Sequence, residues 1–546
     1  MISCKHISKI IGVMMAVAVV LCFWMMAFPQ KVVETLGDVQ VPMQYEEALF
    51  DTDEPIQIDI QMSQEKWKEM LNNAIKEEYY SCDVVINDQK VYNVGIRPKG
   101  NTSLSAIAMD PDSDRYSFKL EFDRYVEGQT CLGLDKLILN NNYADATNMK
   151  EALVYDMYQY LGADASLYNY AKISVNGEYL GVYLALEAVE DSFLMRNYGT
   201  ADGNLYKPDS MNMGGGAKSG GFAGGGFGGQ PPQFSEEKDA GGKKLPKGAD
   251  FQGGEISDFE EGMPFDGEKP DFEDGKLPGG GGFSMGGGNG ANLNYTDDEL
   301  SSYSDIWEGE VTDTGKTDHI RVVTALKNIC GGTDPETYLD VDNVLKYMAV
   351  HAFSVNLDSL SGSMAHNYYL YESNGMLNIL PWDYNLSFGG MNQGPENSAS
   401  DVVNDAVDTP FDGTKFFDVL LENEEYLSRY HEYLRQLAQE YILGGRFETV
   451  YQRIRSQINT LVETDPTAFY SYQEYEAGAE MLYQTVMLRA QSVKGQIDGM
   501  IPSTDEGQRA DASNLVDASD IDISVMGVMD MGGGGMQKSV RAGGGK

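Results

Sequence analysis

Apolar and polar residues alternate along much of the first two hundred residues, which predicts β-strands. The segments 170–175 and 179–186 flank Asn176 and Gly177, the dipeptide that most strongly favours a tight hairpin turn. A second hairpin is expected over residues 83–96, around a short polar turn. The first part of the chain is therefore predicted to form a mixed sheet built from hairpins.

Helical periodicity takes over later in the chain. Residues 149–161 carry apolar side chains at helical spacing, so one helix is expected to pack on the predicted sheet. Residues 341–354 show the same spacing, and three amphipathic stretches rich in Leu and Tyr follow between 416 and 500. The pattern as a whole predicts an α+β protein with a sheet first and a helical part last.

One long segment between these two parts cannot form a core. Of the 80 residues from 211 to 290, 26 are glycine and only three are large aliphatic residues. Such a composition buries too little apolar surface to balance the entropy of ordering the chain, so disorder is expected. Its G-x-G sequences do not open a helix after a strand, and we therefore do not interpret them as phosphate loops.

The N-terminus has the pattern of an export signal or membrane anchor. Residues 10–28 are an unbroken apolar run, long enough to span a bilayer, and Lys5 and Lys9 precede it. Positive residues before such a run keep the N-terminus inside, which places the rest of the chain outside the membrane. No small-residue cleavage site follows, so we expect an uncleaved single-pass anchor in the cell membrane.

The charge of the chain excludes some functions. Lys and Arg number 40 against 84 Asp and Glu, which gives a net charge of −44. Nucleic-acid binding is not expected, because phosphate backbones are bound through Lys and Arg. A basic peptide would be attracted instead. The few cysteines show neither zinc-ligand spacing nor a disulfide framework.

Two aspartates stand on either side of a predicted hairpin near the middle of the second half. Asp358 precedes it and Asp383 follows it in the sequence P-W-D-Y-N, while Asn374 and Gly375 mark the turn. Protein kinases use this arrangement, with a loop Asp that takes the proton of the acceptor hydroxyl and a later Asp that binds Mg²⁺. The alternative is that both residues are turn formers or caps.

Several sequence blocks resemble the spore coat protein H (CotH) family of atypical, secreted-type protein kinases. The resemblance covers roughly residues 55–208 and 295–500. The blocks that carry it are G-I-R-P-K-G-N-T-S at 95–103, Y-S-F-K-L-E-F at 116–122, V-N-G-E-Y-L-G-V-Y-L-A-L-E and G-N-L-Y-K-P within 132–208, and P-W-D-Y-N-L-S-F-G after the hairpin.

This resemblance implies an atypical two-lobed protein-kinase-like fold of the α+β class, with a mixed-sheet N-lobe and a helical C-lobe. It also implies ATP and Mg²⁺ or Mn²⁺ as cofactors, and transfer of the γ-phosphoryl group to Ser or Thr of surface or spore-coat proteins, with autophosphorylation as a further expectation. The expected domains are a signal or transmembrane anchor at 1–30, a nucleotide lobe at 50–208, a disordered insertion at 211–290, a catalytic and helical part at 295–500 and a disordered tail at 503–546.

Candidate residues for nucleotide binding come from the first part of the chain. Lys119, in the middle of a predicted strand, resembles the lysine with which kinases pair the phosphates, and Glu187 is a weaker candidate for its glutamate partner. Arg97 and Lys99 precede Gly100 and Asn101, where the backbone can approach phosphate closely. Trp382 is a candidate for stacking on the purine.

Candidate residues for the metal are Asp383 and Asn367, and Asp358 is the candidate general base. The family pattern often has a second Asp where this chain has Asn385, so the metal site can lack one carboxylate.

Two functions other than that of a kinase are also compatible with the sequence. The chain can be a non-catalytic surface or coat module that retains the fold, or a hydrolase that uses the two aspartates as acid and base on a polysaccharide.

Overall fold

The computed structural model describes residues 41–209 and 289–530, with short breaks at 363, 393–397 and 412, and in addition residues 15 and 535–536. The predicted anchor and the glycine-rich insertion fall almost entirely outside these ranges. In the part of the chain that is described, no helix combines the length and the apolar composition needed to cross a bilayer.

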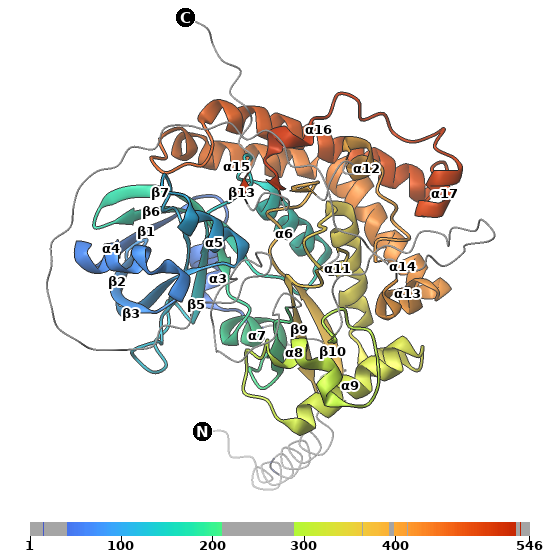
Figure 1. The fold of residues 1–546 in the computed structure, drawn as a ribbon, viewed down its shortest axis with the longest axis horizontal. Coiled ribbons are helices and arrows are strands. Elements are labelled where there is room, and N and C mark those ends of the chain that lie inside the picture. Colours follow the sequence, from blue (N-terminus) through green and yellow to red (C-terminus); the bar gives the residue numbers. More distant parts are fainter. Residues whose placement is uncertain are drawn as a thin grey trace, which may run out of the picture. The chain divides into compact units, whose positions relative to one another are not determined.

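The first part of the chain folds into a closed barrel of seven strands in the order β1-β2-β3-β4-β5-β7-β6 (Figure 1). Neighbouring strands are antiparallel, except that β6 and β1 pair in parallel and close the barrel. The strands are β1 (Ile56–Gln61), β2 (Tyr80–Ile86), β3 (Gln89–Lys99), β4 (Ser117–Glu121), β5 (Lys136–Asn140), β6 (Tyr168–Val175) and β7 (Glu178–Glu187).

Alternation along the strands divides the apolar residues between two cores. In β5, Leu137 and Leu139 point into the barrel, whereas Ile138 between them belongs to the core formed with the helices. In β6, Tyr170 faces the helices and Ile173 faces the barrel interior. The barrel therefore has a core of its own and presents an apolar outer face to the helical part.

The barrel corrects the predicted two-lobed kinase-like fold. The α+β class holds, but the sheet is a closed mixed barrel and not the open sheet of a kinase N-lobe. The predicted hairpins are present, with β2 paired to β3 and β6 to β7, and Asn176 and Gly177 have positive φ at the turn. The barrel closes through the parallel pairing of β1 with β6, in which Ile56 lies opposite Ala171. Local sequence patterns do not predict such a pairing between distant strands.

Helices and short strands complete the molecule, and helix α6 packs against both β6 and α11. The helices that accompany the barrel are α3 (Gln44–Phe50), α4 (Gln64–Asn72), η1 (Ala74–Lys76), α5 (Thr102–Met109), α6 (Lys150–Leu161) and α7 (Asp191–Tyr198). The later helices are η2 (Leu300–Tyr303), α8 (Ser304–Trp307), α9 (Lys316–Cys330), α10 (Pro335–Tyr338), α11 (Val341–Ser354), α12 (Ala399–Asn404), α13 (Lys415–Leu421), α14 (Glu424–Arg435), η3 (Gln436–Ile442), α15 (Arg446–Glu463), α16 (Tyr472–Ile497), α17 (Asp505–Ala510) and η4 (Ile523–Met526).

Two small sheets flank the helices. The predicted hairpin between the two aspartates is present as β9 (Tyr368–Ser373) and β10 (Met376–Pro381), and β8 (Asn204–Tyr206) pairs with β9. The second sheet contains β11 (Met391–Asn392), β12 (Met529–Asp530) and β13 (Gly535–Met536).

The C-terminal residues differ from the tail that the sequence predicts. Residues 503–530 include α17, η4 and β12, and η4 packs against α16. Met526 is fully buried in the helical core, and Val528 and Met529 are also buried. These few apolar side chains are sufficient to hold the otherwise polar segment 503–530 in place, because the helices provide an apolar surface for them to pack on.

Candidate functional site

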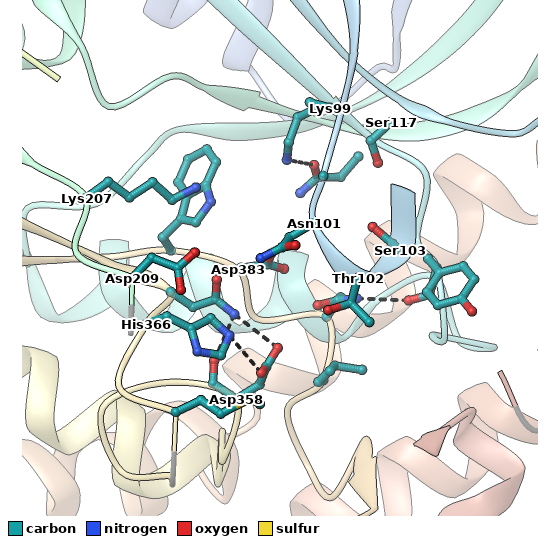
Figure 2. Close-up of a pocket in the computed structure, with 18 of the residues that line it drawn as sticks. Lys99, Asn101, Thr102, Ser103, Ser117, Lys207, Asp209, Asp358, His366 and Asp383 are labelled. Atoms are coloured by element: carbon teal, nitrogen blue, oxygen red, sulfur yellow. Dashed lines mark hydrogen bonds and ion pairs between the residues drawn. The ribbon is translucent and has the colours of Figure 1, made fainter. Parts of the chain in front are cut away.

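A cavity of about 560 Å³ brings together residues from the barrel, α6, the segment after β8 and the loops around the β9–β10 hairpin (Figure 2). Its lining includes the predicted residues Arg97, Lys99, Asp358, Asn367, Trp382 and Asp383. One cavity is thus lined by segments that are far apart in the sequence: the end of β3 and the loops that follow α11 and β10.

Asp358 lies on the loop that follows α11, and both of its carboxylate oxygens are engaged. His366 Nε2 is 3.0 Å from Oδ1, and Asn367 Nδ2 donates to Oδ2 at 3.0 Å. Burial alone lowers the pKa of His366, but the hydrogen bond and the charge of Asp358 raise it above its ordinary value. Asp358 thus stabilises the charged form of His366, and the contact fixes the orientation of the Asp358 carboxylate.

Asp383 follows β10 and lines the same cavity. Its φ of +63° is uncommon for a residue with a side chain, and Asn356 Nδ2 donates to its carbonyl oxygen at 3.1 Å. Burial raises the pKa of the Asp383 carboxyl; Lys99 opposes this shift and Asp358 adds to it. The Asn356 hydrogen bond holds the loops of the two aspartates together, although 25 positions separate Asp358 from Asp383.

Lys99 belongs to a polar chain that leads to a further carboxyl. Its Nζ donates to Asn140 Oδ1 at 2.9 Å, and Asn140 Nδ2 is 2.9 Å from Glu151 Oε2 on the first turn of α6. Burial, followed by the charge of Asp383, raises the pKa of Glu151 to about 8. Sequence reasoning missed Glu151, since an acidic residue in the first turn of a helix usually interacts with the helix dipole alone.

Lys207 is a second lysine in the cavity that the sequence analysis did not select. It follows β8 within the block G-N-L-Y-K-P, and its Nζ lies 5.3 Å from the centre of the Trp382 ring and 5.6 Å from that of Tyr369. Lys99 Nζ lies 5.4 Å from the same Trp382 ring. Burial and the neighbouring charge of Lys99 lower the pKa of Lys207 to about 8.

Among the described residues, Lys207 has no carboxylate within ion-pair distance. Lys99 and Lys207, both labelled in Figure 2, thus each place an ammonium group over the Trp382 ring. Trp382 itself is only 3% exposed. Cation–π contacts with this ring stabilise ammonium groups in a partly desolvated place.

The first turn of α5 forms another wall of the cavity. Gly100 has a φ of +132°, and a Cβ at this position would lie 2.9 Å from Ser103 Oγ. Asn101, Thr102 and Ser103 face the cavity from the N-terminal end of the helix (Figure 2). The backbone N–H groups of a first helical turn have no intrahelical acceptors and carry the positive end of the helix dipole, so this wall favours anions.

Lys119, Glu187 and Arg97, which the sequence also selects for nucleotide binding, form ion pairs with other residues of the protein. Lys119 is not among the residues that line the cavity, and its Nζ forms an ion pair with Glu190, which also pairs with Lys136. Glu187 binds Arg196 through both carboxylate oxygens and has no lysine among its described ion-pair partners.

Arg97 lies at the cavity but binds Glu77, with Nη1 and Oε1 2.8 Å apart. Of the positive groups that the sequence selected at the cavity, Lys99 is therefore the one with a neutral partner, Asn140.

The metal candidates form only part of a coordination shell. In the described part of the chain, no three His, Cys, Asp or Glu side chains are grouped as metal ligands. Asn367 donates an amide hydrogen to Asp358, and Asn385 donates one to the carbonyl of Tyr143. In each residue the amide oxygen therefore points away from that acceptor. The protein alone thus offers the carboxylate of Asp383 and amide oxygens.

Comparison with known proteins gives a consistent result. A family model described as CotH kinase protein matches residues 96–493. The chain is also 21% identical over 392 residues to the inner spore coat protein H of Bacillus subtilis strain 168, a match that covers 71% of this chain and 84% of that protein.

Proposed function

Because this chain belongs to the CotH kinase protein family, we propose that it is a protein kinase that transfers the γ-phosphoryl group of ATP to Ser or Thr hydroxyls. The observation that carries the proposal is the convergence of Asp358, Asp383, Lys99 and Lys207 on one cavity. Phosphoryl transfer needs little covalent chemistry from the protein and depends on positioning and on positive charge around the phosphates.

The residues of the cavity have separable roles in this proposal. Asp358 accepts the proton of the acceptor hydroxyl, and His366 and Asn367 hold its carboxylate in one orientation. Lys99 and Lys207 bind the phosphates, together with the N-terminal turn of α5. The sequence suggests Lys119 and Glu187 as the lysine and glutamate of a kinase, whereas their partners, Glu190 and Arg196, favour a structural role for both.

The donor atoms present suit Mg²⁺ or Mn²⁺. Magnesium commonly binds one or two carboxylates together with substrate phosphates and water, and the cavity offers Asp383 with the amides of Asn367 and Asn385. Asp383 would hold the cation, with Asn367 as the additional ligand. The bound ion would neutralise negative charge on the phosphates. A neutral Asn385 in place of a carboxylate weakens the site without removing it.

The targets that we propose are surface or spore-coat proteins. The relative from Bacillus subtilis is named as an inner spore coat protein, which supports a coat location for this chain. Anchoring to the cell membrane remains a prediction from the apolar run at 10–28. The net charge of −44 favours acceptor segments that carry Lys or Arg.

Phosphate transfer from radiolabelled ATP by the purified full chain tests the proposal. The chain is incubated with a Ser-containing basic peptide and Mg²⁺ or Mn²⁺, next to Asp383→Ala and Asp358→Asn. Incorporation by the wild type that falls at least about 100-fold in both variants is the expected result. Binding of ATP without any transfer would instead identify a non-catalytic module that retains the nucleotide cavity.

A further inference from the structure

His351 is a buried histidine to which the mechanism above gives no role. It lies in the last turn of α11 and is only 1% exposed. Its ring packs against those of Tyr347 and Phe411, with ring centres 5.4 Å and 5.1 Å away. Burial lowers the pKa of His351 to about 3, so the imidazole is neutral near pH 7. A neutral imidazole donates one hydrogen bond and accepts one.

One ring nitrogen of His351 contacts the Asp358 loop, residues 356–361. His351 Nε2 lies 2.7 Å from Ser361 Oγ, and Ser361 Oγ lies 3.0 Å from the carbonyl oxygen of Asn356. A carbonyl oxygen only accepts, so the single hydroxyl proton of Ser361 is donated to Asn356. His351 Nε2 therefore carries the proton of the imidazole and donates it to Ser361. These contacts tie both ends of the Asp358 loop to α11.

The other ring nitrogen contacts the residue that follows Asp383. His351 Nδ1 lies 3.1 Å from the hydroxyl of Tyr384. Because Nε2 carries the proton, Nδ1 accepts from Tyr384, and the Tyr384 oxygen accepts from the hydroxyl of Tyr158 on α6, 2.5 Å away. One arrangement of protons thus satisfies every contact in a chain that runs from α6 through His351 to the Asp358 loop.

Asn356 connects the same two loops a second time. Its Nδ2 donates to the carbonyl of Asp383 at 3.1 Å, and its Oδ1 accepts from the backbone N of Asp358 at 3.4 Å. Asp383 has a φ of +63°, a conformation that persists only where the surrounding structure holds it. The carbonyl of Asn356, which Ser361 binds, therefore belongs to a residue that contacts both aspartates.

We propose that His351 is a positioning residue that sets the separation of the Asp358 and Asp383 carboxylates for phosphoryl transfer. This inference rests on the kinase function proposed above. His351 does not line the cavity that contains the two aspartates, so it acts through their loops and not on the substrate. Transfer needs the acceptor hydroxyl at Asp358 aligned with the phosphates near Asp383, and a misplacement of about 1 Å can lower the rate about 100-fold.

Steady-state transfer from ATP to the basic Ser-containing peptide tests the inference with His351→Phe. This variant keeps a flat ring against Tyr347 and Phe411 and removes both nitrogens. We expect kcat to fall about 10- to 100-fold. KM for ATP, and the affinity for ATP measured by calorimetry, should stay close to those of the wild type, because Lys99 and Lys207 are untouched. An unchanged kcat, or a loss that appears only in KM, would overturn the inference.

Two conservative variants separate the hydrogen bonds from the shape of the ring. The amide of His351→Gln can place a donor near the position of Nε2, towards Ser361. The amide of His351→Asn can place an acceptor near the position of Nδ1, towards Tyr384. At least one of them should recover part of the rate that His351→Phe loses. If neither does, the hydrogen bonds are not the cause and the inference is rejected.

Val344→Ala is the control for a merely structural effect, because Val344 is another fully buried side chain of α11. It should lower the Tm and leave kcat unchanged. A loss of kcat as large as that of His351→Phe would show that any weakening of α11 slows transfer, against the inference. Should His351→Phe fail to fold, Ser361→Ala cuts the same chain in a half-buried loop and should lower kcat with KM for ATP unchanged.

Nitrogen-15 NMR of the chain labelled at histidine tests the hydrogen-bond chain independently of activity. The chain has five histidines, and the signals absent from His351→Phe belong to His351. At pH 7 they should be those of a neutral ring with its proton on Nε2. A ring with its proton on Nδ1, or a charged ring, would overturn the inference.

The activity of the wild type distinguishes this inference from the proposed function. A wild type that transfers phosphate next to an equally active His351→Phe would reject the positioning role and leave the kinase function standing. A wild type that transfers none would reject the two together.

Discussion

Lys99 and Lys207 place two ammonium groups on the indole of Trp382, and neither has a carboxylate partner within ion-pair distance among the described residues. Two like charges in a partly desolvated cavity repel each other, which contributes to the lowered pKa of Lys207. An anionic ligand with several charges relieves this repulsion. We therefore propose that the pair binds a polyphosphate.

Lys207→Met tests this role directly. A hydrogen bond to a charged group contributes about 1.5–3 kcal/mol, so we expect ATP to bind about 10- to 100-fold more weakly. Isothermal titration calorimetry measures the change. Lys68→Met, at an exposed lysine of α4, is the matched control and should bind ATP like the wild type. Equal affinities in all three proteins would contradict the assignment.

The pH dependence of binding gives a second prediction for Lys207. Its pKa is about 8, and the charged groups that influence it are Lys99, Asp383, Asp209 and Lys119. Lys207 is an ammonium below this pKa and neutral above it, so ATP affinity should fall as pH rises through about 8 or somewhat higher, since the bound anion raises the pKa. The fall should be much smaller in Lys207→Met, and identical pH profiles would reject the interpretation.

His366 is expected to act through Asp358. Replacement by Phe removes the group that holds the Asp358 carboxylate, and we expect kcat to fall about 10- to 100-fold with little change in KM for ATP. His366→Gln keeps a donor near the position of Nε2 and should recover part of the rate. Steady-state kinetics of the two variants provides the measurement. A rise in KM with unchanged kcat would instead indicate a role in nucleotide binding.

At the scale of elements, the C-terminal segment 522–530 and the loop before α6 approach each other closely at Gly527, and Ala146 N donates to the carbonyl of Met526 at 3.0 Å. Its φ is +81°, and a Cβ there would lie 2.7 Å from Ala144 O and from Ala146 N. Residues with side chains rarely adopt this conformation, and the neighbouring backbone leaves no space for one. A glycine at this position therefore allows the segment that contains η4 and β12 to lie against the loop before α6, with Met529 of β12 in the cavity wall.

Gly527→Ala should destabilise the protein by about 1–3 kcal/mol and weaken the packing of the segment 522–530 against the loop before α6. Urea denaturation measures the loss. Gly499→Ala is a suitable control, because Gly499 also has a positive φ, +70°, but no atom lies within 4 Å of the added Cβ. The control should lose only the strain of the left-handed conformation, about 1 kcal/mol. Equal losses would show that the close contact is unimportant.

At the scale of the whole molecule, a buried ion pair joins the barrel to the C-terminal helices. Arg115, just before β4, binds Asp465, just after α15, and both side chains are at most 2% exposed. Arg115 Nη1 also donates to Thr467 Oγ1 at 2.7 Å. Residues separated by 350 positions thus hold together the two parts of the molecule that enclose the cavity.

Arg115→Met should destabilise the fold by about 3–5 kcal/mol, because the buried Asp465 then loses its opposite charge and keeps only neutral donors such as Val182 N and Thr467 N. The double variant Arg115→Met with Asp465→Leu should recover part of this loss, since no unpaired charge remains buried, although Val182 N and Thr467 N lose Asp465 as an acceptor. Thermal unfolding of the single and double variants measures both effects. A double variant less stable than Arg115→Met would contradict this account.

The sequence by itself determined the local elements and a large part of the candidate site. Hairpin turns at Asn176 and Asn374, the helix before Asp358 and the blocks typical of the CotH family depend on neighbouring residues, so they are visible without a structure. Asp383 and Lys99 could be selected because their residue types and their places after strands suggested the chemistry.

Only the tertiary structure decided which groups meet. Closure of the barrel through β1 and β6, the arrival of Lys207 and Glu151 in the cavity, and the separate pairing of Lys119 with Glu190 all depend on contacts between distant segments. The physical reason is that a side chain's charge and availability are set by its partners in space. Sequence patterns give the identity of a residue, whereas burial and pairing determine what that residue is free to bind.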